Sequence, residues 1–222
     1  MKTFLLTLLF FTQLSCMSKA QEQTNVQLPV DSLPSPAHIT LLFAGDLMQH
    51  QAQINAAYTP SGYDYSDYFK SIKDEISRAD IAIGNLEVTL GGKPYKGYPT
   101  FSAPDEYLYA IRDAGFNVLV TANNHCLDKG KNGLERTIQM LDSLHIPHAG
   151  TYINADTRKQ QYPLLLEQNG FRIALLNYTY GTNGIKVTYP NIVNYIDKAI
   201  IMQDIKDAKT LHPDALFVFG NA

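Results

Sequence analysis

Apolar stretches of two kinds alternate along the chain. Short continuous runs, typical of buried strands, occur at 38–44, 80–84, 116–120, 146–150 and 215–219. Longer segments with apolar residues three or four positions apart predict helices at 65–79, 104–114, 130–144 and 195–209. Asn169-Gly170 separates two further apolar runs, 163–168 and 171–177, and this arrangement predicts a β-hairpin.

The order of these elements predicts an α/β fold. Strands and helices alternate over the first half of the chain, which implies a largely parallel sheet. The hairpin adds antiparallel strands, so we expect a mixed sheet with helices covering its faces. The helix predicted at 65–79 would bury one face that carries Tyr68, Phe69, Ile72 and Ile76.

The N-terminal residues have the pattern of a secretory signal. Lys2 precedes an apolar run at 4–11, which is much shorter than the roughly 20 residues that span a bilayer. Ser18-Lys19-Ala20 offers small residues for cleavage after residue 20, so residues 1–20 are expected to be a signal peptide. The protein is then exported and, in one alternative, is a soluble periplasmic protein.

A second alternative involves Cys16. The segment Gln13-Leu14-Ser15-Cys16 resembles a bacterial lipobox in which the cysteine carries the lipid, although Gln13 occupies a position that is usually Leu. In that case the protein is a membrane-anchored lipoprotein of the cell envelope. Its contact with the membrane would be made only through this lipid anchor.

Composition and charge narrow the class of protein. Residues 21–37 contain three prolines and no apolar period, so we expect a linker that precedes a domain at 38–222. The chain has 18 Lys plus Arg and 21 Asp plus Glu, a net charge of −3, which argues against a nucleic-acid partner. Two cysteines argue against a disulfide scaffold and against an all-cysteine zinc site.

Three polar clusters directly follow predicted strands. They contain, in chain order, Asp46 and His50; Asn85 and Glu87; and Asn123, Asn124, His125 and Asp128. Because the carboxyl ends of parallel strands lie along one edge of a sheet, these side chains should meet there, where open α/β sheets bind ligands. Asn183, in the loop after the hairpin, is expected to add a wall for a substrate.

The donor atoms of these clusters suit a divalent metal. Carboxylates, imidazole and amide oxygens without a thiolate cluster favour Mn, Mg, Fe or Zn. Each residue also has a structural alternative. Asp46 and Asp128 are typical of helix N-caps or turns, and Asn123-Asn124 tolerates left-handed turn geometry.

The clusters together resemble a known family. GDLMQH at 45–50, GNLE at 84–87, TANNHCLDKG at 121–130 and NYTYGTNG at 177–184 are similar to the CapA-type capsule synthesis proteins. The resemblance covers residues 38–219. It implies a role linked to poly-γ-glutamate biosynthesis and a calcineurin-like metallophosphoesterase architecture, with four α/β/β/α layers and a two-metal site.

The resemblance also implies roles for single residues. By position, the metal ligands would be Asp46, Asn85, Glu87, Asn124 and His125. His125 and Asn124 would in addition be catalytic. His50, Asn123, Asp128 and Asn183 are further candidates whose roles the match does not settle.

The C-terminal part departs from the family pattern. Members continue past a strand like 215–219 into a His-Trp-Gly segment and a later His-containing loop, whereas this sequence has Gly220-Asn221-Ala222. We therefore expect a C-terminally incomplete domain whose metal site has fewer nitrogen ligands.

Three functions remain open from the sequence. The first is a metal-dependent hydrolase that acts on a phosphoester or on an anionic capsule polymer. The second is a non-catalytic envelope component that binds or anchors that polymer, together with the capsule synthesis or export machinery. The third is an inactive truncated product.

Overall fold

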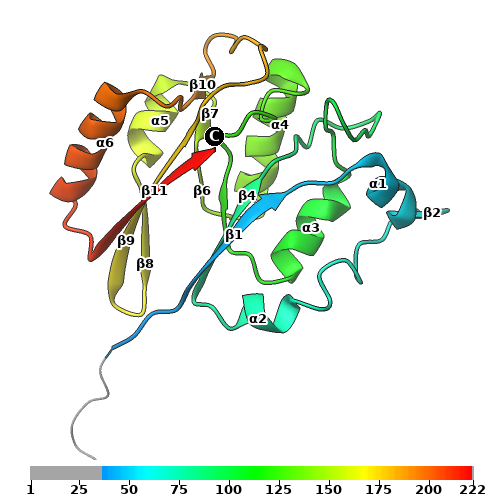
Figure 1. The fold of residues 1–222 in the computed structure, drawn as a ribbon, viewed down its shortest axis with the longest axis horizontal. Coiled ribbons are helices and arrows are strands. Elements are labelled where there is room, and N and C mark those ends of the chain that lie inside the picture. Colours follow the sequence, from blue (N-terminus) through cyan, green and yellow to red (C-terminus); the bar gives the residue numbers. More distant parts are fainter. Residues whose placement is uncertain (1–36, 222) are drawn as a thin grey trace, which may run out of the picture. The chain divides into compact units, whose positions relative to one another are not determined.

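The computed structural model describes residues 37–221, which form one compact unit (Figure 1). The signal peptide, Cys16 and all of the predicted linker except residue 37 lie outside the described residues. The elements are, in chain order, β1 (Leu41–Leu47), α1 (Gln51–Ala57), β2 (Tyr58–Thr59), β3 (Gly62–Tyr63), α2 (Lys73–Ser77), β4 (Ile81–Leu86), α3 (Asp105–Asp113), β5 (Val118–Val120), α4 (Gly130–Ser143), β6 (His148–Ala149), β7 (Thr151–Tyr152), α5 (Ala155–Gln161), β8 (Leu164–Gln168), β9 (Phe171–Thr179), β10 (Ile192–Val193), α6 (Lys198–Thr210) and β11 (Ala215–Asn221).

Two main sheets organise the molecule. The first has the strand order β1-β4-β5-β6, and all its pairs are parallel. The second has the order β11-β9-β8, in which β11 is parallel to β9 and β8 is antiparallel to it. Short antiparallel pairs, β10-β7 and β2-β3, complete the described strands.

The two sheets pack face to face through alternate side chains of their strands. Ile83 of β4 and Val118 of β5 share one buried cluster with Ile173 and Leu175 of β9. Because strand side chains alternate between faces, Ala82 of β4 points the other way and belongs to a different cluster. The apolar runs of β4 and β5 are therefore buried on both faces, whereas those of the edge strands β1 and β11 are partly exposed.

Helices cover the two outer faces. Leu108 of α3 and Leu141 of α4 pack in the cluster on the outer face of the parallel sheet. Ile201 and Ile205 of α6 pack against the outer face of the second sheet, beside Leu176. Figure 1 shows α5 and α6 on one side of the strands and α3 and α4 on the other. The order helix, sheet, sheet, helix confirms the mixed four-layer α/β/β/α class.

Several predicted elements are confirmed. The helices at 104–114 and 130–144 correspond to α3 and α4. The hairpin at Asn169-Gly170 joins β8 to β9, and both turn residues have positive φ, 53° and 82°. That pair of angles is the one that a two-residue hairpin turn requires, and Asn and Gly tolerate it best.

The helix predicted at 65–79 is wrong over most of its length. Only α2, Lys73–Ser77, is helical there. Residues before it form successive turns, in which backbone N–H groups bond to carbonyls three positions earlier, as Ile72 does to Phe69. Phe69 is buried, but Ile72 is 49% exposed, so the expected single buried face does not form. Packing of aromatic rings around Tyr107 overrides the helical period.

The structure also differs from the prediction at strand ends and in short helices. β1 and β4 extend to residues 47 and 86, so Asp46 and Asn85 lie inside strands rather than after them. The short helices α1 and α5 were not predicted. Among the described residues, none of the helices has the length and apolar character needed to span a membrane.

Candidate functional site

The predicted clusters meet at the carboxyl-end edge of the parallel sheet. Asp46 of β1 is the register partner of Asn85 of β4. The register of the two strands shifts between Phe43 and Asp46, as at a β-bulge. A bulge inserts an extra residue and turns the side chain that follows it, so this shift aims Asp46 toward Asn85.

Asp46, Asn85 and Glu87 form the centre of the site. The amide Nδ2 of Asn85 donates hydrogen bonds to Asp46 Oδ1 at 2.9 Å and to Glu87 Oε2 at 2.7 Å. One amide group thereby holds a carboxylate of β1 and a carboxylate that directly follows β4. In this arrangement Asn85 positions the two acids, while its own oxygen accepts from Asn123 at 3.0 Å.

The two acids of the centre lie close together, and this affects the pKa of Glu87. Glu87 is only 5% exposed. Burial, followed by the hydrogen bond and the charge of Asp46, raises the pKa of Glu87 to about 7. Near neutral pH the pair therefore binds a proton readily, and a cation placed between the carboxylates would relieve the same repulsion.

The loop after β5 is tied to this centre by Asn123. Its Nδ2 also donates to the carbonyl of Leu86 at 2.8 Å, and its Oδ1 accepts the backbone N–H of His125 at 3.1 Å. Asn123 is fully buried, so these bonds fix where the loop lies. The third polar cluster is thereby positioned against the second.

His125 and Asp128 form a close pair. His125 Nδ1 lies 2.8 Å from Asp128 Oδ2, and the side chain of Asp128 is 1% exposed. Burial raises the pKa of Asp128, although the backbone N–H of Phe101 and the His125 ring, both of which bond to it, act in the opposite direction. This contact fixes the orientation of the His125 ring. Nε2 is then the ring nitrogen that does not contact Asp128.

Asn124, Asn183 and His125 line a cavity of about 440 Å³ together with Tyr98 and Ile185. Asn124 Nδ2 lies 3.4 Å from Asn183 Oδ1, and Asn183 Nδ2 lies 3.4 Å from His125 Nδ1. Asn183 therefore reaches the site from the loop after β9, as the sequence predicted. The cavity offers amide donors and acceptors next to the imidazole.

His50 lies beside the site but outside its hydrogen-bond network. Its ring packs edge-on against Phe101 at 5.3 Å, and Phe101 packs edge-on against His125 at 4.7 Å. Phe101 thus separates the two imidazoles. Among the described residues, no hydrogen bond joins the His50 ring to Asp46 or Glu87.

Asn221 is a site residue that the sequence prediction missed. Its Nδ2 donates to Glu87 Oε2 at 3.2 Å, and its Oδ1 accepts the backbone N–H of Asn124 at 3.2 Å. It ends β11 and so joins the second sheet to the site of the first. The sequence does hold a signal for it, because Gly45-Asp46, Gly84-Asn85 and Gly220-Asn221 repeat one dipeptide pattern at the ends of three apolar runs.

The chain matches the family model described as bacterial capsule synthesis protein PGA_cap over residues 40–219. It belongs to this family. The match spans the whole described domain, from β1 into β11, and includes all the site residues up to Asn183.

Individual relatives agree with the family. The capsule biosynthesis protein CapA of Bacillus anthracis is 30% identical over 150 residues, which cover 64% of this chain and 34% of that protein. The uncharacterized protein y4uA of Sinorhizobium fredii (strain NBRC 101917 / NGR234) is 30% identical over 147 residues, which cover 62% of this chain and 30% of that protein. The matched part therefore spans about a third of the length of these relatives.

Among solved structures, the NAD nucleotidase NadN of Haemophilus influenzae superposes with a TM-score of 0.49 and 14% sequence identity. The match covers 81% of this chain and 33% of that chain.

The donor set of the site suits a hard divalent cation. Asp46 and Glu87 supply two carboxylates at one point, and the amides of Asn85 and Asn221 contact them. Within residues 37–221, no three His, Cys, Asp or Glu side chains converge closely enough to hold a metal by themselves. A cation bound between these two carboxylates would need water or substrate oxygens to complete its coordination.

Proposed function

We propose that this member of the capsule synthesis family is a metal-dependent hydrolase of the cell envelope, acting on a phosphoester or on an anionic capsule polymer. One divalent cation, Mn, Mg, Fe or Zn, would bind between Asp46 and Glu87. The observation that carries the proposal is this carboxylate pair: one acid on β1 and one directly after the adjacent parallel strand β4, both held by one amide, with the pKa of Glu87 raised to about 7.

Asp46 and Glu87 would be the protein ligands of the cation. A cation bound there supplies positive charge that polarises a phosphoryl or acyl group and favours attack by water. Asn85 and Asn221 hold the two carboxylates in place through their Nδ2 groups. Asn124, whose amide lines the cavity, would stabilise negative charge that develops on the substrate.

His125 is suited to move a proton at the leaving group. Its Nδ1 is committed to Asp128 at 2.8 Å, so the proton would be given or taken at Nε2. The buried Asp128 holds the ring in one orientation and would stabilise its protonated form. In this arrangement Asp128 is a positioning residue, and His125 is the general acid or base.

Metal titration of the EDTA-dialysed protein tests the cation site. We expect micromolar binding of Mn by calorimetry, weakened at least about tenfold by Asp46→Asn and by Glu87→Gln, because each removes one charged ligand. Asp67→Asn, which changes an exposed acid that does not line the cavity, is the matched control and should leave binding unchanged.

Hydrolysis of p-nitrophenyl phosphate with added Mn tests the chemistry. His125→Gln should lower kcat by about 10²-fold or more while leaving metal affinity unchanged, since general acid–base catalysis contributes roughly that factor. A purified protein that neither binds Mn at micromolar concentration nor hydrolyses the aryl phosphate or the capsule polymer would contradict the proposal.

A non-catalytic polymer-binding component is the second candidate. The small number of acidic and imidazole groups that converge in the described residues favours it. Retention of an anionic polymer that survives Asp46→Ala and His125→Ala would support binding without hydrolysis.

Export belongs to the same proposal. The protein would be periplasmic or a lipoprotein anchored through Cys16, near the capsule synthesis or export machinery. Membrane fractionation of wild type and Cys16→Ser distinguishes these two alternatives.

A further inference from the structure

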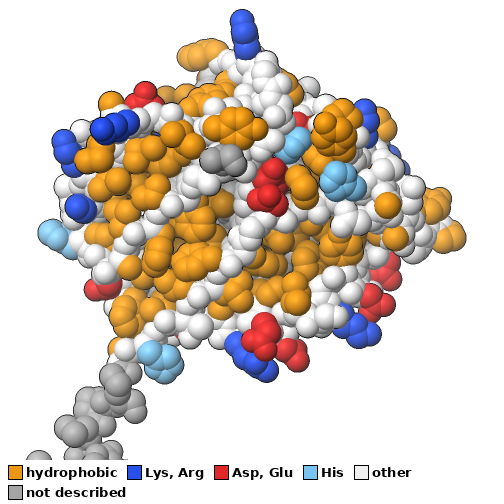
Figure 2. All heavy atoms as spheres, viewed as in Figure 1, with side chains coloured by type: hydrophobic (Ala, Val, Ile, Leu, Met, Phe, Trp, Pro, Cys, Tyr) orange, Lys and Arg blue, Asp and Glu red, His pale blue; other side chains and the backbone are white. Residues whose placement is uncertain are grey.

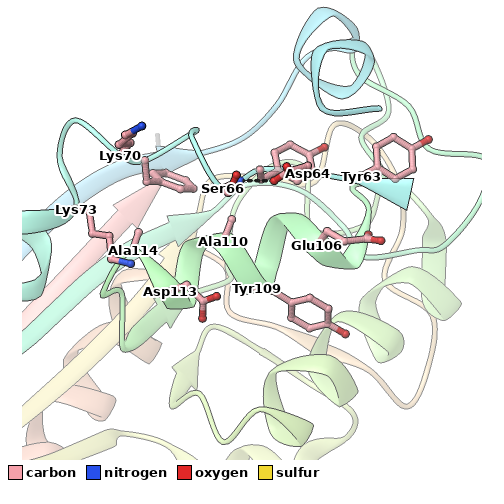
Figure 3. A pocket seen from close by; sticks show the side chains of 12 residues that line it. Tyr63, Asp64, Ser66, Lys70, Lys73, Glu106, Tyr109, Ala110, Asp113 and Ala114 are labelled. Atoms are coloured by element: carbon pink, nitrogen blue, oxygen red, sulfur yellow. Dashed lines mark hydrogen bonds between the residues drawn. The ribbon is translucent and has the colours of Figure 1, made fainter. Parts of the chain in front are cut away.

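A second pocket lies between the segment 63–73 and helix α3 (Figure 3). It encloses about 340 Å³, which is at the lower end of the roughly 300–1,000 Å³ that small-molecule sites occupy. Its lining includes none of the residues of the strand-edge site. The buried ring of Phe69 and the small side chains of Ala110 and Ala114 leave the space open.

Charges of both signs line this pocket at different places. The ionisable acids and lysines of its wall are Asp64, Lys70, Lys73, Glu106 and Asp113. Figure 3 shows Lys70 and Lys73 at one end of the pocket, and Tyr63 and Glu106 at the other. In the described part of the chain, neither Lys73 nor Glu106 forms an ion pair within 4.0 Å. Two opposite charges therefore face one cavity without a partner in the protein.

The geometry points to a site for a short peptide with free amino and carboxyl ends. Its ammonium group would lie at Glu106, and its carboxylate at Lys73, since Lys70 already pairs with Asp67 at 3.2 Å. A polyanion fits less well, because three acids outnumber two lysines in the lining. A ligand with only a cation would leave the lysine end unmatched.

The separation of the two ends sets the length of the peptide. Glu106 and Asp113 lie on α3 seven residues apart, which corresponds to about 10 Å along a helix. Lys73 lies at the Asp113 end of the pocket in Figure 3. Because an extended chain spans about 3.3–3.6 Å per residue, three residues bridge that distance. A free amino acid, whose two charges are adjacent, cannot reach both ends.

Aromatic rings complete the match. Tyr63 and Tyr109 stand at the Glu106 end of the pocket, as Figure 3 shows. The face of Tyr63 would attract an ammonium group in addition to the carboxylate of Glu106. The ring of Tyr109 is 38% exposed, and the guanidinium of Arg112 lies 5.9 Å from its centre. The apolar floor of Phe69 and Ala110 would accept the central side chain of the peptide.

The probe is the tripeptide Ala-Phe-Ala, titrated into the full chain by calorimetry in EDTA, so that the metal site takes no part. Its N-acetylated, C-amidated and doubly blocked forms are the matched ligands. We expect the free peptide to bind saturably and each block to weaken binding about two- to fivefold, as expected for the loss of one largely exposed ion pair. Equal affinity of the free and doubly blocked peptides, or no saturable binding up to about 10 mM, would overturn the proposal.

Two variants of the protein test which end of the pocket binds the ammonium group of the peptide and which binds its carboxylate. Glu106→Gln should abolish the difference in affinity between the free and the N-acetylated peptide. Lys73→Gln should reduce the difference in affinity between the free and the C-amidated peptide. Lys159→Gln and Glu167→Gln, exposed on other elements, are controls that should change neither difference. A loss of stability would weaken all four ligands alike, so it is distinguished from the loss of a specific contact. Failure of this site leaves the hydrolase proposal untouched.

Discussion

Glu87 is the single residue whose ionisation depends most on the fold of the site. It lies on the sheet edge with one oxygen accepting from both Asn85 and Asn221, and its carboxyl group is close to that of Asp46. Burial and the neighbouring acid both favour the protonated form. Its carboxylate is therefore destabilising for the folded chain unless a cation is present.

The raised pKa of Glu87 predicts how the stability of the folded protein depends on pH. The folded-state pKa of Glu87, about 7, lies above its ordinary value of 4.5, so the folded protein binds the proton more tightly. The contribution of Glu87 to the free energy of unfolding is present below about pH 4.5 and is lost as pH rises to about 7. In EDTA, Glu87→Gln should lessen the fall in unfolding free energy between pH 5 and pH 8 by roughly 2–3 kcal/mol, measured by urea denaturation.

The exposed acid Glu167 supplies the control for this measurement. Its side chain is 67% exposed, so Glu167→Gln should reproduce the wild-type pH dependence. Identical pH dependence in wild type and Glu87→Gln would show that Glu87 titrates like an exposed acid.

The sequence predicts most residues of the site but misses one of them, Asn221. It placed Asp46, Glu87, Asn123 and His125 at one edge because each lies at or just after a strand end. It did not find Asn221. Gly220-Asn221 does repeat the dipeptide of the other strand ends, but that pattern does not show that β11 lies next to β9 and ends beside Glu87. The metal and catalytic roles of these residues stay predictions.

Among the elements, the pairing of β1 with β4 controls the site most directly. The side chain of Leu47 packs over Gly84, where an added Cβ would lie 2.4 Å from its Cδ1. Leu47 is itself only 7% exposed and cannot turn into solvent without leaving the core. Gly84 directly precedes Asn85, and Leu47 directly follows Asp46, so this contact lies next to both site residues.

Gly84→Ala should therefore disturb both stability and the site. Overpacking of a filled core costs roughly 1–3 kcal/mol, and we expect that loss in urea denaturation together with weaker Mn binding. Gly45→Ala is the control on the partner strand, because nothing lies within 4 Å of the Cβ it would add. Equal stability of the two variants would mean that the strands separate without cost.

The elements also show which local patterns are reliable. The hairpin and α4 agree with the sequence because Asn-Gly and a long apolar period each favour one local conformation. The segment 65–79 does not, because Tyr65 and Phe69 gain more from packing against α3 than a short isolated helix gains from its own hydrogen bonds. Those turns also form one wall of the pocket in Figure 3.

At the scale of the whole molecule, one apolar side of the two sheets is exposed as far as residues 37–221 show. β1 and β11 are both edge strands of their sheets in the described residues. The ring of Phe43 on β1 lies 5.1 Å from Phe217 and 5.4 Å from Phe219, and bridges the two edges. Figure 2 shows hydrophobic side chains gathered on this face of the molecule.

This side should bind an apolar dye. Phe43 is 44% exposed and Val218 is 46% exposed, so anilinonaphthalene sulfonate should fluoresce with the folded protein. Phe43→Ser combined with Val218→Ser should lower that fluorescence at least about twofold without lowering the signal of secondary structure. Tyr189→Ser, which removes a single side chain that is 91% exposed, is the control and should leave the fluorescence unchanged.

The sequence by itself determined the family, the strand-rich α/β composition and the positions of the polar clusters. These follow from local information: the period of apolar residues, the chemistry of turn residues and the short motifs at strand ends. Tertiary structure alone decided that the strands divide into two facing sheets, that Asn221 joins the site, and that the turns at 65–72 replace a helix. Each of these depends on contacts between segments far apart in the chain, and the energy of such contacts is absent from any single stretch of sequence.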